Sequence, residues 1–164
     1  MTGELDLYLS ELKRILAKLR EAIEGLDEAQ LNWRPSTPEA NSVYVIAAHI
    51  LGNIEAWVLG IVGEQPIERD RPAEFRAEGP EAAPLVERAH QLESQIEQAL
   101  ASLTPATLDQ IREPSQSLWG ESATRPIAVR AALMHTIEHA ATHLGHIDVV
   151  RDLALASEHV QPTR

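Results

Sequence analysis

Four of the chain's seven histidines lie within one short stretch near its C-terminal end, MHTIEHAATHLGHI. They are His135, His139, His143 and His146. An imidazole can bind a metal ion, transfer a proton near neutral pH, or pack as a hydrogen-bonded ring in a core. Most of what this sequence predicts about function depends on which of these roles the four side chains have.

His139 and His143 have the spacing of a pair of metal ligands. Residues i and i+4 are neighbours on the surface of an α-helix, so both rings can reach one ion. At 100° per residue, all four histidines fall within an arc of about 80°. A four–three spacing that is apolar at both ends runs through them, which predicts that their stripe points into a helical bundle. The positions in this spacing are Ala128, Ala132, His135, His139, Thr142, His146, Val149 and Leu153.

A third ligand has to come from another helix. His49 is the only histidine in the apolar segment VYVIAAHILGNIEAWVLGIV and can face inward. The residues on the same side of that helix are Ile46, Asn53, Ala56 and Gly60. Three histidine ligands leave a coordination position open for water or substrate, which is typical of catalytic metal sites. Imidazole suits zinc, nickel, copper or iron(II), and the spacing does not select among them.

The four histidines can also be ordinary packing residues. An isolated HxxxH pattern is a weak signal, and a lone buried histidine usually packs with its nitrogens hydrogen-bonded. However, burying several imidazoles without partners costs about 1–3 kcal/mol for each unsatisfied group, and a core built only for stability would use leucine. His135 is the best candidate for a packed core histidine. His146, less than one turn beyond His143, is a candidate proton carrier or substrate contact.

Four segments have the periodicity of helices, at approximately residues 4–26, 42–62, 81–103 and 125–155. Leucine and isoleucine recur in the first segment at spacings of four and three without a break. Prolines separate the segments, and Thr124 with Pro126 is expected to begin the fourth helix. The pattern predicts an all-α fold, a four-helix bundle. The length of 164 residues fits one domain spanning 1–164.

The charge of the chain argues against nucleic acid as a partner. Lysine and arginine total 14 against 25 aspartates and glutamates, which gives a formal net charge of −11. Such a field repels a phosphate backbone, and no basic cluster offsets it. The chain has no cysteine, so a protein thiol cannot be its nucleophile or metal ligand. The acidic, amphipathic N-terminus is unlike a signal peptide, and we expect a cytoplasmic protein.

Segment 43–62 is long enough to span a membrane. It contains His49, Asn53 and Glu55, and the other three segments are amphipathic and need an apolar partner. We therefore expect it to be the most buried helix of the bundle and expect no membrane association. A helix this apolar also calls for more burial than one small bundle provides, which favours a homodimer.

The sequence resembles the DinB-like (YfiT-like) superfamily of metal-dependent enzymes over essentially its whole length. The resemblance is carried by LDEAQLNWRP, NSVYVIAAHILGNIEAW and HTIEHAATHLGHIDVVR. It implies a four-helix bundle in which His49, His139 and His143 hold a divalent metal, the set that spacing also favours. His146 departs from the family pattern, where glutamine is common at this position. Characterised members are transferases or isomerases that use low-molecular-weight thiols such as bacillithiol or mycothiol.

The expected function is therefore that of a metal-dependent enzyme acting on a small-molecule substrate, a thiol S-transferase or a related hydrolase or isomerase. Zinc and nickel are the first candidate metals, with iron, manganese and copper as others. The metal would lower the pKa of a bound thiol or water, and the lack of cysteine fits a thiol supplied as cosubstrate. The alternative is a non-catalytic stress-response module in which the metal only staples the bundle and His146 can serve as a fourth ligand.

Overall fold

Four long helices form the protein, as the sequence predicted. The computed structural model describes residues 3–37, 39–120 and 123–157. The bundle consists of α1 (Gly3–Ile23), α3 (Val43–Ile54) continued by the π-helix η1 (Glu55–Val62), α5 (Ala83–Ala101) and α7 (Val129–Ser157). Each helix packs on two neighbours, α1 on α5 and α7, and α3 with η1 on the same two from the other side.

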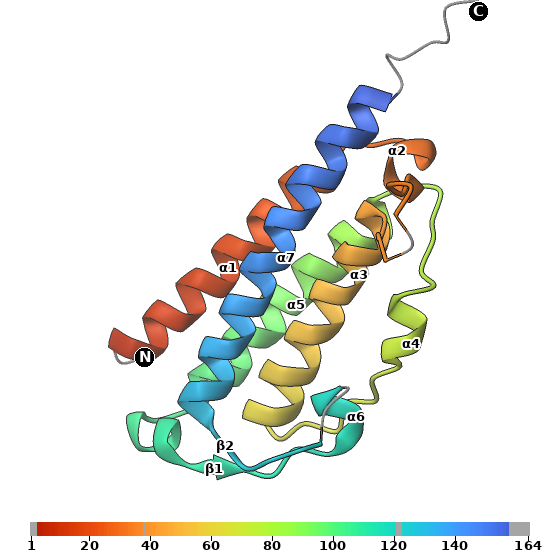
Figure 1. Cartoon of the computed structure of the whole chain (residues 1–164). Coiled ribbons are helices and arrows are strands. Elements are labelled where there is room, and N and C mark those ends of the chain that lie inside the picture. Colours follow the sequence, from red (N-terminus) through yellow and green to blue (C-terminus); the bar gives the residue numbers. More distant parts are fainter. Residues whose placement is uncertain (1–2, 38, 121–122, 158–164) are drawn as a thin grey trace, which may run out of the picture.

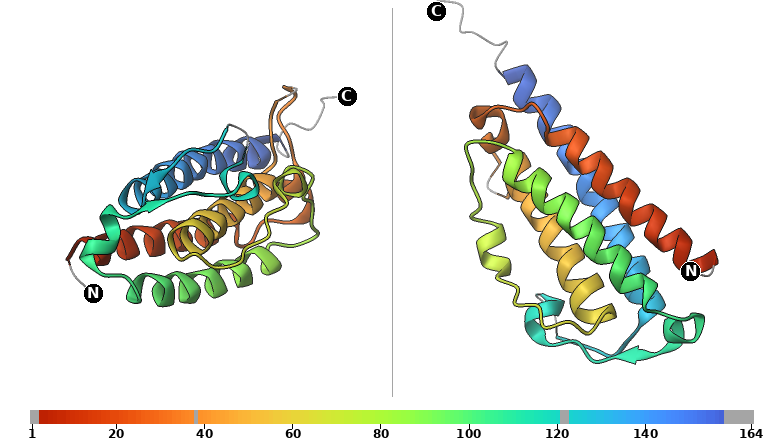
Figure 2. Two further views of the ribbon diagram at one scale, coloured as in Figure 1. Left: turned by 90° about the horizontal axis from the view of Figure 1, so that it is seen from below. Right: turned by 180° about the vertical axis from the view of Figure 1, so that it is seen from behind.

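The helices run in an unusual order of directions. Figure 1 shows α1 and α7 running side by side in one direction, while α3 and α5 run in the opposite direction. Parallel α3 and α5 need a long return connection, and residues 63–82 run back along the bundle to provide it. This connection carries the short helix α4 (Arg71–Glu74), which packs on α3 (Figure 2).

Helix α3 with η1 is the most buried part of the molecule. Ser42 caps its start by accepting a hydrogen bond from the Val45 backbone N–H at 3.2 Å. The stretch Val43–Val62 is the one helix in the described part of the chain that is long and apolar enough to cross a membrane, and 94% of its most apolar window is buried inside the bundle. The single chain therefore buries this apolar surface without a second copy.

The predicted helix ends differ from the observed ones in three of the four long helices. The first helix ends at Ile23 rather than near residue 26, because Gly25 adopts a φ of +81° and turns the chain into α2 (Glu28–Asn32). The third helix spans Ala83–Ala101 rather than 81–103. Prediction of a helix start at Thr124 was wrong, since α7 begins only at Val129.

A two-stranded ladder delays the start of α7. β1 (Ile111–Arg112) pairs antiparallel with β2 (Ile127–Ala128), so residues 127–128 are extended rather than helical. The Val129 N–H then bonds to the Gln110 carbonyl oxygen at 3.0 Å. The 3-10 helix η2 (Pro105–Asp109) and the short helix α6 (Gln116–Trp119) complete this end of the bundle.

The histidine stripe of α7 does not point into the centre of the bundle, contrary to the prediction. The residues that α7 buries are Val129, Ala132, Leu133, Thr136, Ala140, Leu144, Ile147 and Ala154. At 100° per residue, the four histidines lie about 90° around the helix from the middle of that set. Val149 and Leu153, which the spacing placed in the core, are 60% and 47% exposed. The histidines therefore line the edge of α7 that faces α3.

Candidate metal centre

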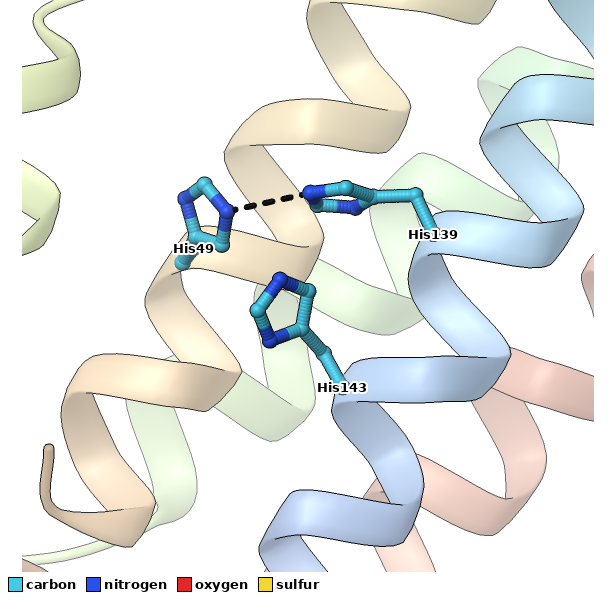
Figure 3. Close-up of side chains that lie close together, drawn as sticks. All are labelled: His49, His139 and His143. Atoms are coloured by element: carbon cyan, nitrogen blue, oxygen red, sulfur yellow. Dashed lines mark hydrogen bonds between the residues drawn. The ribbon is translucent and has the colours of Figure 1, made fainter. Parts of the chain in front are cut away.

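Three histidines from two helices meet at this edge. His49 comes from the middle of α3, and His139 and His143 lie one turn apart on α7 (Figure 3). One nitrogen from each ring lies within 4.8 Å of one nitrogen from each of the other two. The ring centroid of His49 is 5.0 Å from that of His139 and 4.9 Å from that of His143. The structure thus brings together the three residues that spacing and resemblance both selected.

The separation of the nitrogens suits a small divalent cation. The Nε2 atoms of His49 and His139 are 3.3 Å apart. Two bonds of about 2.0–2.1 Å to zinc at a tetrahedral angle place their nitrogens about 3.3–3.4 Å apart. The donor set also fits, because three imidazoles are common ligands of a metal ion with an open coordination position.

Glu74 fixes the ring of His49. The Nδ1 atom of His49 lies 2.8 Å from a carboxylate oxygen of Glu74, and both side chains are buried. Because a carboxylate only accepts, Nδ1 carries the hydrogen and Nε2 presents its lone pair toward His139 and His143. This is the arrangement in which a metal-binding histidine is held by a carboxylate behind it.

Arg69 completes a buried network behind the triad. Its Nε and Nη2 atoms donate to the two oxygens of Glu74 at 2.7 and 3.0 Å. The side chain of Arg69 is 3% exposed and that of Glu74 is 8% exposed. Burial raises the pKa of Glu74, but the hydrogen bonds from His49 and Arg69 lower it by more, so the net shift of the pKa is downward. The carboxylate is therefore ionised where it holds His49.

Glu74 and Arg69, which lie in the charged connection before α5, were not predicted from the sequence as site residues. Two local features of the sequence indicate that Glu74 approaches α3. Asp70 caps α4 through the Ala73 N–H at 3.0 Å, and Pro72 stands in the first turn, a helix-start pattern that sets Glu74 on the inner side. Gly52 lies three residues after His49, and a Cβ there would come within 2.2 Å of a Glu74 carboxylate oxygen. The glycine allows the carboxylate to approach α3.

His139 and His143, the two histidines that α7 contributes to the triad, are neutral near physiological pH. Burial, followed by the nearby His143 and His49, lowers the pKa of His139 to about 3. Burial and then His49 lower the pKa of His143 to about 4. Neutral imidazoles keep the lone pairs that a metal ion needs, so no proton has to be removed before binding at neutral pH.

His146 and His135 lie on either side of the pair and differ from it. His146 is exposed, and its Nδ1 lies 3.3 Å from Nδ1 of His143. That contact leaves Nε2 of His143 for a metal, and the proton-carrier role of His146 stays a prediction. His135 packs on the buried ring of Trp57 with centroids 4.1 Å apart, in line with the expected packing role.

Two cavities meet at the triad. The first, here called the Phe75 cavity, has a volume of about 390 Å³. It is lined by Glu39, Ala40, Asn41, Val45, Ile46, His49, Phe75, His143, His146, Val149 and Val150. The second, the Asn53 cavity, has a volume of about 220 Å³. It is lined by His49, Asn53, Arg69, Arg71, Trp119, Gly120, His135 and His139. His49 belongs to both, so a bound metal would be accessible from either side.

The bundle and its three facing histidines agree with what the resemblance to DinB-like proteins implies. The chain belongs to the mycothiol-S-transferase family, whose model matches residues 8–155. A search of curated proteins found no match. The family assignment therefore rests on the family model, and the solved structures described next support the fold.

Several solved structures share the fold at low sequence identity. A DinB-like protein from Bacillus cereus aligns with a TM-score of 0.69 and 18% identity over 90% of both chains. A conserved protein from Enterococcus faecalis gives 0.68 and 18%, over 95% of this chain and 99% of the other. YfiT from Bacillus subtilis, described as a probable metal-dependent hydrolase with an unusual four-helix bundle topology, gives 0.67 and 18%, over 92% and 87%.

Proposed function

We propose that the protein is a metal-dependent S-transferase that joins a low-molecular-weight thiol of the mycothiol or bacillithiol type to a small electrophile. The observation that carries the proposal is the three-histidine cluster, open to two cavities, in a chain of the mycothiol-S-transferase family. The chain has no cysteine, so the reacting sulfur has to come from a cosubstrate.

In this proposal His49, His139 and His143 hold the ion, and zinc or nickel is the first candidate. A divalent ion held there supplies a Lewis acid that lowers the pKa of a thiol or water bound to it. Glu74 orients the ring of His49, and α7 orients the other two rings. The Phe75 cavity, walled by Val45, Ile46, Val149 and Val150, receives the apolar part of the electrophile.

His146 can hold or deliver a proton at the mouth of the Phe75 cavity. It is exposed, lines that cavity and contacts His143. An imidazole with access to water exchanges protons rapidly near neutral pH. In the substitution, the thiol sulfur forms a carbon–sulfur bond as the bond between that carbon and its leaving group breaks; the leaving group departs with the electron pair, and the thiol proton passes to His146 or water.

A hydrolase using metal-activated water is the second candidate. It is favoured by the likeness to YfiT, which is described as a probable metal-dependent hydrolase. The open triad suits water as well as thiol. Analysis of the products separates the two functions, because a hydrolase yields a cleaved substrate without thiol, whereas the transferase yields a thioether.

The experiment is conjugation of monobromobimane to mycothiol or bacillithiol by the zinc-loaded and nickel-loaded protein. We expect a rate well above that of the thiol alone, lost on chelation and restored by metal. His143→Ala is expected to lose both metal and rate while keeping its helical circular dichroism, whereas His90→Ala, on α5 and outside the triad, keeps both. Full metal content in His143→Ala would contradict the ligand assignment. Absence of any rate above the free thiol, in either metal form, would contradict the transferase.

The rival role, a metal that only staples the bundle, predicts a closed coordination sphere. X-ray absorption of the purified protein distinguishes the two, because a fourth protein ligand such as His146 favours the staple and a bound water favours the enzyme.

We also propose that the protein is a cytoplasmic homodimer that acts on a small-molecule substrate and binds neither nucleic acid nor a membrane. One chain already buries the apolar helix at residues 43–62, so this helix by itself does not require a dimer. Light scattering at micromolar concentration tests the dimer directly.

A further inference from the structure

The Asn53 cavity contains buried polar atoms without partners. Asn53 is 4% exposed and its Oδ1 atom accepts no hydrogen bond within the described part of the chain. Nδ1 of His139 is also buried and has no hydrogen-bond partner among the described residues. Both residues line this cavity, beside the triad. A buried polar group that stays unpaired costs about 1–3 kcal/mol, so such a pair of atoms points to a ligand or water that satisfies it.

The two atoms are complementary in hydrogen bonding. The Nε2 atom of His139 is the one that faces His49, so it is the atom available to a metal. A neutral imidazole that binds metal through Nε2 carries its hydrogen on Nδ1. The Asn53 cavity therefore offers one acceptor, Oδ1 of Asn53, and one donor, Nδ1–H of His139. A group that both donates and accepts can pair with both.

The group that fits is neutral rather than anionic. Two arginines line the cavity, and both are engaged: Arg69 donates to both oxygens of Glu74, and the guanidinium of Arg71 lies over the ring of Phe75, 4.7 Å from its centroid. A carboxylate would leave Asn53 Oδ1 facing another acceptor, which is unfavourable in a buried site. An amide places an N–H and a carbonyl oxygen on adjacent atoms and carries no charge.

We propose that the Asn53 cavity binds an amide group of the thiol cosubstrate, with the amide N–H donating to Asn53 and its carbonyl accepting from His139. The proposal rests on the transferase function proposed above. It divides the site in two: the thiol approaches from the Asn53 cavity, and the electrophile from the Phe75 cavity. Asn53 is then a determinant of which thiol the protein accepts.

The test measures binding of three thiols to the cobalt-substituted protein through the thiolate-to-cobalt charge-transfer band. The probes are 2-acetamidoethanethiol, 1-pentanethiol of the same chain length, and 3-mercaptopropionate. The measured quantity is the ratio of dissociation constants between the thiols. In the cobalt protein with the original amino-acid sequence, we expect the amide thiol to bind at least fivefold more tightly than either of the other thiols, corresponding to one or two hydrogen bonds.

Asn53→Leu keeps the approximate volume and removes the acceptor, so the preference for the amide over the alkyl thiol should fall at least fivefold. Asn53→Ala is the second variant, and the cobalt d–d bands report whether the triad is intact in each. Val149→Ala, in the Phe75 cavity, is the comparison variant for the other cavity, and His90→Ala, on α5 and outside both cavities, is the control that should leave the ratio unchanged. Loss of the preference in Val149→Ala but not in the Asn53 variants would show that the amide binds in the Phe75 cavity and would overturn the inference.

The possible failures are distinguishable. If no thiol produces the charge-transfer band, thiol chemistry at the metal is wrong and the inference falls with it. If the thiols bind without preference in the unsubstituted protein, the Asn53 cavity holds only water and the inference alone is overturned. Tighter binding of 3-mercaptopropionate than of the amide thiol would overturn the neutral class of ligand.

Discussion

At the scale of single residues, the candidate centre depends on a charged pair that stands behind it. The buried Glu74 sets which nitrogen of His49 faces the cluster, and Arg69 keeps that carboxylate ionised. A buried carboxylate with one partner removed leaves an uncompensated charge, so the two residues act as one unit. The three histidines alone do not define the candidate site.

Glu74→Gln tests this unit. The amide oxygen can still accept from His49, but the ring loses a charged partner and becomes a weaker ligand, so metal affinity should fall about 10-fold to 100-fold. Competition with a chromophoric chelator measures the affinity. The matched control is Glu64→Gln, because Glu64 also pairs with an arginine, Arg112 at 3.2 Å, but is 68% exposed.

The same substitution leaves Arg69 without its charged partner, which destabilises the fold independently of metal. The double change Glu74→Gln with Arg69→Met removes the uncompensated charge. Metal affinity that stays low in the double variant supports the positioning role. Recovery of full affinity together with stability would show that Glu74 acts only on the fold.

At the scale of elements, the short helices α4 and η1 shape the surroundings of the triad, which the long helices alone do not. Helix α4 brings Glu74 to the outer side of α3, and the absence of a side chain at Gly52 allows that contact. Helix α3 then passes into the wider turns of η1, which is the type of local irregularity often found next to functional sites. Asn53 and Trp57 lie on either side of this transition.

Gly52→Ala should weaken metal binding without touching a ligand. The added Cβ would overlap the Glu74 carboxylate, which has to move away from His49. We expect metal affinity to fall at least tenfold. Gly145→Ala is the control, since a Cβ at this helical position on α7 meets nothing within 4 Å. The control should gain up to about 1 kcal/mol of helix stability and keep its affinity.

At the scale of the whole molecule, the order of helix directions places α3 beside α7. The return connection 63–82 lets α3 and α5 run in the same direction and carries α4 along the outside of α3 (Figure 1). One side of the site therefore comes from residues more than 60 positions before the other. Burial of the histidines between these helices couples the pH dependence of folding to the site.

The metal-free protein should lose stability as the pH falls below about 6.5. The folded-state pKa values of His139 and His143, about 3 and about 4, lie below the usual value of 6.5. Between the folded-state pKa and 6.5, the unfolded chain binds more protons than the folded one. The free energy of unfolding therefore decreases as the pH decreases, by at most about 1.4 kcal/mol per pH unit for each histidine.

Urea unfolding at several pH values, with chelator present, measures this slope. His139→Asn should reduce it, because the variant lacks one of the two buried imidazoles. A slope between pH 6.5 and 4 that is the same in His139→Asn as in the original protein would contradict the assignment to these histidines.

The sequence by itself determined the four helices and the ligand candidates. Apolar periodicity reports which residues a helix buries, and an i, i+4 histidine pair remains adjacent wherever its helix packs. His49 followed because it is the only histidine in the most apolar helix. These are properties of one helix at a time, and they need no knowledge of how the helices are arranged.

Only the tertiary structure decided how α7 is rotated, why Thr124 does not begin it, and what stands behind His49. The histidine and apolar spacings on α7 overlap, so periodicity could not show that the histidines lie at its edge rather than in the core. The β1–β2 pair and the contact between Glu74 and His49 join residues distant in sequence. Pairing across a fold depends on the packing of whole elements, which local spacing does not encode.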